Sequence, residues 1–524
     1  MTMFFTELPI SLSPLSITLM WVVFPLLVGF SVYLFPRLAR VLSLAVALAS
    51  LPYGLWHTTL QSPLRIQLVD SFGVNLLMDE LSGYFILTNA LVTTAVILYC
   101  WQQNKGSFFY TQVTILHGCV NAIFICADLI SLYVALEVIG IAAFLLITYP
   151  RTNKSIWVGL RYLFISNTAM LFYLMGAALA YQSGGSFAFT GLSGVPPEAI
   201  ALIFLGLLSK GGIFVSGLWL PLTHSESETP VSAMLSGIVV KAGVFPLVRF
   251  ALLVPELGPL VQIFGVGTAV LGVSLAIAQK DTKRVLACST ISQIGFILAA
   301  PAVAGFYAFA HGTAKAALFL TVGKLPSRDF ATLRQTSIRF SLWILIAIAS
   351  FSIAGLPLVA GFDAKVLSLK QLEGLPLIAL NVVTVGSAIA LSQFIFLPFY
   401  NDLRDNSPKL SSLQSAGVQS AGVQSAGVLT KASTQPAFSI TARWAVALLI
   451  GGLVVASALH IEEYTPANLA KALGKGGLGF LLYQVCVRRL KFNFSQTPEK
   501  LEHIVGGMSL LLTLLFWMAV EYGA

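Results

Sequence analysis

Apolar runs of about 18 residues or more recur along the whole chain, separated by short polar segments. Each run is long enough to cross a hydrocarbon core of about 30 Å as a helix. The strict alternation that marks a transmembrane β-barrel is absent. We therefore predict an all-α polytopic membrane protein with about 14–16 transmembrane helices. The predicted spans are residues 15–35, 40–57, 80–101, 109–127, 128–149, 158–181, 199–222, 231–253, 258–279, 284–300, 302–323, 338–360, 375–400, 441–460, 473–487 and 503–522.

Lysine and arginine gather in alternate loops, which the positive-inside rule places on the cytoplasmic side, with the N-terminus outside. The weakly alternating segment 58–79 is predicted to be a polar external loop. Residues 414–428 repeat QSAGV three times, so we expect a flexible, low-complexity cytoplasmic loop over 401–440.

The composition agrees with a membrane protein, because 57% of the 524 residues are hydrophobic and 10% are charged, against about 25% charged in soluble domains. The net charge of +9 is explained by loop topology and does not indicate nucleic acid as a partner. The five cysteines lack CxxC spacing, which favours free buried thiols over disulfide or metal roles. We predict no catalytic residue, no bound cofactor and no metal site.

Two lysines, Lys210 and Lys241, lie within long apolar surroundings. A lysine at membrane depth costs about 3 kcal/mol on insertion scales, so it marks a functional site by default. Between them lie a Trp219-Leu220-Pro221 break and a short polar loop, His224–Thr229. Interrupted helices at membrane depth line protein-enclosed pathways and do not face lipid, so we predict a charged pathway here.

A second interruption carries Gly355, Pro357 and Gly361, with Asp363 and Lys365 beside it. Asp363 either pairs with Lys365 or caps the loop. Breaks at corresponding places in two halves indicate inverted repeats, each with a site. The predicted divisions are N-terminal helices with an external loop (1–108), a first repeat (109–253), a second repeat (258–400), the low-complexity loop (401–440) and C-terminal helices (441–524).

Other charged residues interrupt apolar helices. Glu137 lies in the middle of its segment, and Lys210 is its natural partner, either as a static structural pair or as a working one. Lys241 is about ten residues into its helix, which disfavours snorkelling. His311 and Lys315 are spaced i, i+4 and share one face, which favours a proton relay over a lone core histidine.

The remaining loop charges are interpreted as solvated, and the basic ones as determinants of orientation. They are Glu226, Glu228, Lys280, Lys283 and Arg284.

Four ordered motifs over residues 80–400 resemble the antiporter-like subunits shared by respiratory complex I and Mrp-type cation/proton antiporters. The motifs are the Lys210…Trp219-Leu220-Pro221…Thr229-Pro230-Val231-Ser232-Ala233…Lys241-Ala242-Gly243 run, Asp281–Gly295 (DTKRVLACSTISQIG), His311–Leu320 (HGTAKAALFL) and Gly355–Lys365 (GLPLVAGFDAK). The Ser236-Gly237 pair and the run Ile504–Trp517 resemble the D-type component of Mrp antiporters more than complex I subunits.

This resemblance implies about 14 helices, two inverted five-helix repeats with one broken helix each, and a hydrophilic axis at mid-membrane. It implies a coupling pair of Glu137 and Lys210, a central relay at Lys241 and its continuation through His311 and Lys315. It also places Lys365 at the terminal exit. His224 and Asp363 are assigned accessory places, and His224 substitutes for a histidine that many members carry at Ser236-Gly237.

The resemblance implies a proton-translocating membrane subunit of a monovalent cation (Na⁺/K⁺)/proton antiporter. It would work with other membrane subunits in a bacterial-type plasma membrane or a thylakoid-like energy-transducing membrane. The alternative is a proton-pumping membrane subunit of an NADH or ferredoxin:quinone oxidoreductase, in which electron chemistry belongs to partner subunits. An independent carrier and a structural scaffold fit the charged residues less well.

Overall fold

The computed structural model describes residues 13–60, 62–69, 73–400, 438–488 and 500–522. The first half of the chain contains α1 (Pro14–Leu34), α2 (Ala39–Thr58), α3 (Glu80–Cys100), α4 (Ser107–Ile123), α5 (Leu129–Ile147), α6 (Asn153–Gly184), α7 (Pro197–Gly211), α8 (Leu220–Glu226), α9 (Thr229–Met234) and α10 (Val240–Leu253). The second half contains α11 (Gly258–Ala278), α12 (Thr282–Ala299), α13 (Ala304–Val322), α14 (Phe330–Leu333), α15 (Phe340–Ala354), α16 (Gly361–Lys370), α17 (Gly374–Ile395), α18 (Ile440–Ala458), α19 (Pro466–Leu482) and α20 (Leu501–Tyr522).

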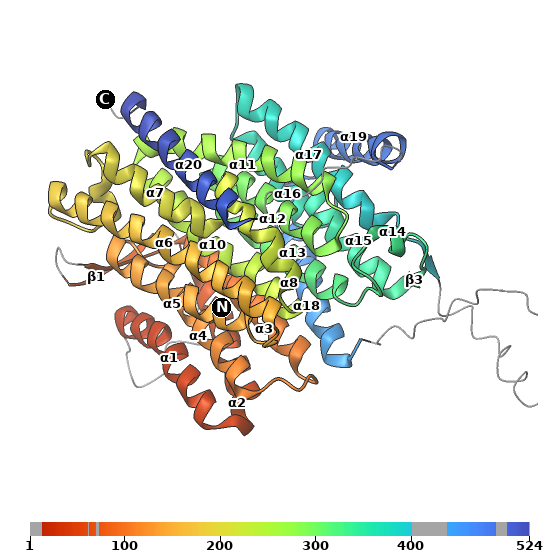
Figure 1. Ribbon diagram of the computed structural model, residues 1–524, viewed down its shortest axis with the longest axis horizontal. Helices are drawn as coiled ribbons and strands as arrows, with labels where there is room; N and C mark the ends of the chain where they lie inside the picture. The colour runs from red at the N-terminus through yellow and green to blue at the C-terminus, as the bar shows by residue number, and fades with distance from the viewer. Residues whose placement is uncertain (1–12, 61, 70–72, 401–437, 489–499, 523–524) are drawn as a thin grey trace, which may run out of the picture.

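These helices form one bundle, with α1 and α2 at one end and α15, α17 and α19 at the other (Figure 1). Among the described residues, 11 helical segments are long and apolar enough to cross a membrane. The number rises to 12 if α12 and α13, which are bent by 106° relative to each other, count as one span. The prediction of an all-α polytopic membrane protein is therefore confirmed. The prediction of 14–16 spans is higher partly because α15, counted within span 338–360, has only 15 residues.

Two small sheets accompany the helices. β1 (Leu64–Val69) and β2 (Gly73–Met78) form an antiparallel hairpin within the segment 58–79, which was predicted as a polar external loop without strands. Asp128 holds the hairpin to the bundle by accepting a hydrogen bond from the Asn75 backbone N–H at 2.8 Å. β3 (Ile338–Arg339) and β4 (Phe399–Tyr400) pair in parallel and join the two ends of the α15–α17 unit.

Side-chain caps fix where several helices begin. Asp79, Asp128 and Asp281 each accept a hydrogen bond from the backbone N–H three residues later, at 2.7–3.0 Å. These bonds satisfy donors that the first turn of a helix leaves unpaired. Asp79 also forms an ion pair with Arg249, which is only 2% exposed on α10. The start of α3 is thereby tied to the centre of the bundle.

The centre of the bundle is the helical run from α9 to α10, in which every residue from 230 to 250 is buried. The run passes through a π-helical turn, η4 (Leu235–Val239). Glycines allow its close approach to α7, because a Cβ on Gly243 would overlap the backbone nitrogen of Gly211. This contact places α7 and its Lys210 directly against the helix that carries Lys241.

Residues 109–253 and 258–400 each contain a helix that ends at a left-handed glycine, Gly212 after α7 and Gly355 after α15, with φ of +67° and +81°. The division into two repeats stays a prediction. Residues 401–437, which include the repeated QSAGV segment, lie outside the described residues.

The Gly243→Ala substitution is expected to lower the free energy of unfolding by about 1–3 kcal/mol, because the added methyl group has no space against the α7 backbone. Gly451→Ala on α18 is the matched control, since a Cβ there meets no atom within 4 Å. The measurement is the thermal melting temperature in detergent. Equal melting temperatures for the two variants would contradict the close approach.

Candidate functional site

The first break lies between α7 and α8 and starts before the predicted Trp219-Leu220-Pro221. α7 ends at Gly211, Gly212 adopts the left-handed conformation, and a 3₁₀ turn, η3 (Phe214–Trp219), leads into α8. The Trp219 indole N–H donates to the Ser209 carbonyl at 3.0 Å, which satisfies an acceptor at the end of α7. Pro221 lies in the first turn of α8, where its missing N–H costs nothing.

Lys210 lies in the last turn of α7 and is 4% exposed. Its Nζ donates to Ser166 Oγ of α6 at 2.5 Å. The predicted contact pair with Glu137 is not formed, since no carboxylate of the described chain lies within 4.0 Å of this Nζ. The two groups are nevertheless neighbours, because the Nζ fits over Gly140, one turn beyond Glu137, where a Cβ would be only 2.9 Å away.

Glu137 lies on the outer side of the bundle. Its side chain is half-buried, and Oε1 is buried without a hydrogen-bond partner within the described protein. Val134 and Ile141, three residues before it and four after it, are 56% and 50% exposed. The carboxylate therefore lies on an apolar, outward face of α5.

Lys241 lies directly after the π-helical turn and is fully buried. Its Nζ donates to the carbonyls of Gly237 and Ser236 at 2.7 and 3.3 Å. A π-turn displaces carbonyls from the regular α-helical ladder, and such turns recur at functional sites. The backbone deformation thus supplies the oxygens that hold this ammonium group.

His311 and Lys315 extend the site on α13. The Nδ1 atom of His311 is 3.5 Å from Lys241 Nζ, and its Nε2 has no partner within the described protein. Lys315 Nζ donates to the Leu286 carbonyl of α12 at 2.9 Å. His311 and Lys315 share one face of α13, as predicted. Each side chain extends from that face to a buried polar group.

One side of α12 connects these groups. Thr290 Oγ1 is 2.7 Å from Ser236 Oγ and donates to the same Leu286 carbonyl that Lys315 uses. One turn further, Gln293 donates to Ser387 at 3.2 Å and accepts from Tyr307 at 2.7 Å. The spacings of four and three residues put these positions on one side of the helix. Gln293 and Thr290 were not among the predicted site residues.

Lys365 follows the second break, on α16, and is 4% exposed. Its side chain passes over Gly355, and its Nζ lies 3.4 Å from the Ala354 carbonyl at the end of α15. The ring of Phe296 on α12 lies under the ammonium group, 5.1 Å from it. The second break begins at Gly355 and ends at Gly361, and Pro357 lies between them where no helical N–H is needed.

Asp363 has neither of its two predicted roles, which were an ion pair with Lys365 and a cap on the loop. It forms no ion pair with Lys365, and its Oδ2 accepts a hydrogen bond from Ser457 of α18 at 2.6 Å. Ser457 also contacts the Tyr464 hydroxyl at 2.6 Å. The carboxylate therefore joins α16 to the segment between α18 and α19.

His224 belongs to helix α8, so the prediction of a polar loop from this residue is wrong. The imidazole is fully buried, stacks on Phe319 of α13 at 5.0 Å, and has no partner for either nitrogen within the described protein. Phe319 follows Lys315 by four residues on α13, so the His224 ring packs one helical turn beyond Lys315.

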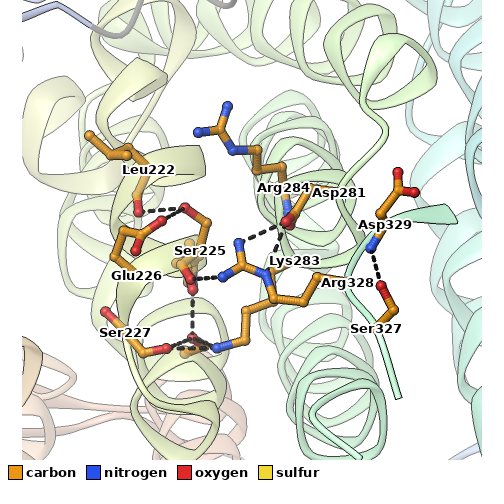
Figure 2. Close-up of polar contacts among 12 residues, drawn as sticks. Leu222, Ser225, Glu226, Ser227, Asp281, Lys283, Arg284, Ser327, Arg328 and Asp329 are labelled. Atoms are coloured by element: carbon orange, nitrogen blue, oxygen red, sulfur yellow. Dashed lines mark hydrogen bonds and ion pairs between the residues drawn. The ribbon is translucent and has the colours of Figure 1, made fainter. Parts of the chain in front are cut away.

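Lys283 is buried, so the prediction of a solvated side chain at this position is also wrong. Its side chain is 7% exposed, and Nζ donates to the Ser227 carbonyl at 2.6 Å and reaches Ser232 Oγ at 3.4 Å (Figure 2). Ser232 in turn donates to the His224 carbonyl at 3.0 Å. The signal that the sequence offered was position, since Lys283 directly precedes the predicted span 284–300.

An ion-paired layer covers Lys283. Arg328 contacts both Asp281 Oδ2, at 2.7 Å, and the Ser225 carbonyl, at 2.7 Å (Figure 2). Glu226 pairs with Lys154 at 3.0 Å, and Glu228 pairs with Lys105 at 2.6 Å. Both glutamates are thus paired and not merely solvated. This layer joins the end of α8 to the start of α12.

Asp329 starts the short helix α14 beside this layer. Partial burial raises the pKa of its carboxyl group, but the hydrogen bonds from Thr332 outweigh that effect and hold the pKa below its usual value. No group of three or more His, Cys, Asp or Glu side chains in the described ranges is placed to hold a metal ion.

Residues 126–390 match the family model described as NADH:quinone oxidoreductase/Mrp antiporter, TM. The chain belongs to this family. The matched range contains both helix breaks and all the buried lysines described above. The protein is thus an antiporter-like membrane subunit, integral to the membrane and of the type found in Mrp antiporters and complex I.

Relatives from both branches of the family are similar to this subunit. NAD(P)H-quinone oxidoreductase chain 4 1 of Synechococcus elongatus is 30% identical over 381 residues, which cover 64% of this chain and 71% of the relative. A Staphylococcus aureus protein named as antiporter subunit mnhD2 is 28% identical over 360 residues, covering 63% and 72%. The fold is also that of a chain in the Mrp complex from Dietzia sp. DQ12-45-1b, with a TM-score of 0.70, 19% identity and coverage of 93% and 98%.

Replacing Lys283 by Gln is expected to reduce ion transport by the assembled complex about tenfold, equivalent to about 1.4 kcal/mol, because the buried positive charge beside Ser227 and Ser232 is lost. Lys280→Gln removes the same charge from an exposed position three residues earlier, and it is expected to retain the wild-type rate. The measurement is initial transport rate in vesicles at matched complex abundance. Equal rates for the two variants would return Lys283 to a role in orientation.

Proposed function

We propose that this antiporter-like subunit translocates protons along a row of buried cations, as part of a monovalent cation (Na⁺/K⁺)/proton antiporter in which it occupies the place of the D-type component of Mrp complexes. The row runs from Lys210 through Lys241, His311 and Lys315 to Lys365. The single observation that carries the proposal is the bonding of these lysines to neutral oxygens. In the described chain none has a carboxylate within 4.0 Å.

A neutral acceptor suits a group that must gain and lose a proton. An ammonium group held by a carboxylate keeps its proton. Desolvation destabilises the charged form of a lysine among carbonyl and hydroxyl oxygens, so such a lysine shifts readily between protonation states. Static stabilisation would favour paired charges, since an unpaired buried charge is destabilising. Between Lys241 and Lys315, the Ser236 and Thr290 hydroxyls and the Leu286 carbonyl form a hydrogen-bonded connection.

Lys210 acts as the switch in this proposal. It is bonded to Ser166, with Glu137 on the next turn of α5, so a change in side-chain conformation exchanges one partner for the other. At an effective dielectric constant of about 20, a contact pair at about 4 Å contributes about 4 kcal/mol. Formation and loss of that contact would therefore alter the proton affinity of Lys241, the next group in the row, by a free energy of up to this order.

The outward position of Glu137 connects the switch to a neighbouring subunit. The carboxylate lies on a face of α5 where Val134 and Ile141 are exposed. A charged group of a neighbour packed on this face would act on Glu137 first, and through it on Lys210. The buried pair His224 and Lys283 supplies the approach to Lys315 from the side predicted to be cytoplasmic.

Glu137→Gln is expected to reduce proton transport by the intact complex at least about tenfold, because the neutral amide cannot draw Lys210 away from Ser166. Glu198→Gln, in the exposed first turn of α7, is the matched control and is expected to transport at the wild-type rate. Proton flux is followed with a pH-sensitive dye in vesicles that contain equal amounts of complex. Undiminished transport in the Glu137 variant would refute the switch.

A second function is supported by the similarity to an NAD(P)H-quinone oxidoreductase chain. In that case the same buried row would serve a redox-driven pump, and partner subunits would carry out the electron transfer. The chain of hydrogen bonds along α12 is compatible with either driving force.

Purification of the tagged subunit from its native membrane in mild detergent, followed by mass spectrometry, separates the two functions. The antiporter proposal expects small hydrophobic membrane subunits, and Na⁺- or K⁺-dependent proton exchange in vesicles. Co-purification of iron–sulfur and quinone-site subunits would instead establish the redox pump and overturn the antiporter.

A further inference from the structure

A cavity of about 480 Å³ opens between α16, α17 and α19, and Lys365 lies in its wall. Three further lysines line it, namely Lys370 at the end of α16 and Lys471 and Lys475 on α19. The sequence analysis assigned no role to these three residues. The cavity thus joins the last buried lysine of the proposed row to a surface of the bundle.

The lysines that line this cavity differ in whether a carboxylate neutralises them. Lys370 is neutralised by Glu463, whose two oxygens lie 2.5 and 2.8 Å from its Nζ. Lys471 and Lys475 have no carboxylate within 4.0 Å in the described chain, although they are adjacent on one face of α19 at i, i+4. Like charges at this spacing destabilise a helix, so stability does not explain their presence.

Glycines bring Lys475 close to the second break. Gly476 packs on Leu356, where a Cβ would be 2.6 Å from the leucine side chain, and Gly479 packs on α17 at Val385 and Ala388. Leu356 directly follows Gly355, over which the Lys365 side chain passes. The close approach of α19 therefore places the half-buried Lys475 beside the inner end of the cavity.

The remaining polar groups of the cavity continue toward the start of α19. Asn381 and Thr384 of α17 line it, as does Asn468, which donates to the Glu463 carbonyl at 3.0 Å. α18 follows the loop predicted to be cytoplasmic and crosses the bundle, so α19 starts on the side predicted to be external. The lysines thus form a graded series, with Lys365 innermost, then Lys475, then the exposed Lys471.

We infer that this cavity is the aqueous passage through which Lys365 exchanges protons with the external phase, and that Lys475 is the charged group that favours release from Lys365. The inference rests on the proposed function, and it adds to that function a location for the outlet and a residue that controls it. A fixed positive charge close to Lys365 opposes simultaneous protonation of both amines. A proton that reaches Lys365 is thereby passed outward through water and not held.

The test uses the intact complex and a background in which Cys486, the one cysteine that is not fully buried in the described chain, is replaced by Ala. Lys475→Cys places a thiol inside the cavity. Leu478→Cys is the matched control, because Leu478 lies on the same helix, is 51% exposed and does not line the cavity. A thiol facing lipid stays protonated and reacts slowly with a membrane-impermeant methanethiosulfonate reagent.

The Lys475→Cys variant is expected to react at least about tenfold faster than the control, and only when the reagent is added to the predicted external face. Its proton transport is expected to fall several-fold, to recover after modification with a trimethylammonium reagent and to stay low after modification with a sulfonate reagent. Val366→Cys, on the α16 wall, provides the same labelling measurement if the first variant does not assemble.

Labelling no faster than the control, or labelling from the opposite face, would overturn the passage, as would a cavity closed by lipid or by a neighbouring subunit. Transport that does not respond to the restored positive charge would overturn the role of Lys475. These outcomes are distinguishable from failure of the proposed function, because reagent access to the cavity does not depend on the Glu137 switch or on the cation exchanged.

Discussion

The rest of the structure depends on one constraint, which is that an ammonium group inside a membrane bundle needs oxygen atoms around it. Regular helices offer few, because most of their carbonyls are already bonded within the helix, although Lys315 reaches the Leu286 carbonyl of α12. The protein frees carbonyls by deforming its backbone. The π-helical turn presents Ser236 and Gly237 to Lys241, and the end of α15 presents Ala354 to Lys365. Helix breaks and buried lysines are thus two aspects of one arrangement.

Glycine makes the same arrangement possible in space. Gly140 leaves room for the Lys210 ammonium, Gly243 lets α10 meet α7, and Gly476 lets α19 reach the second break. Each of these positions lies beside a lysine of the proposed pathway. A methyl group at Gly243 would overlap the α7 backbone, and one at Gly140 or Gly476 would displace the side chain of Lys210 or Leu356. Close helix packing through small residues is common in membranes, and here it also determines where the charged side chains end up.

Hydropathy and motif order predicted the membrane architecture, the family and the helices that carry the buried lysines. The start of α3 at Glu80 and the second break at Gly355–Gly361 were placed within a residue or two. Partners across helices were not predictable, because they depend on tertiary geometry. Glu137 was assigned to Lys210 as a contact pair, yet Ser166 is the partner that the fold supplies. Lys283 was assigned to solvent and His224 to a polar loop for a similar reason, since one sequence cannot show which polar turn another helix covers.

The distribution of carboxylates separates structural charges from working ones. Arg249 with Asp79, Lys370 with Glu463 and Lys105 with Glu228 are all paired, and all lie at helix ends or in turns. The buried lysines at the two breaks and at the π-turn bond only to neutral oxygens in the described chain. Because an uncompensated buried charge is destabilising, stability alone does not account for the unpaired row. The proton transfer that we propose would account for this row, and in that proposal its two ends, at Glu137 and at the α19 cavity, meet a neighbouring subunit and the aqueous phase.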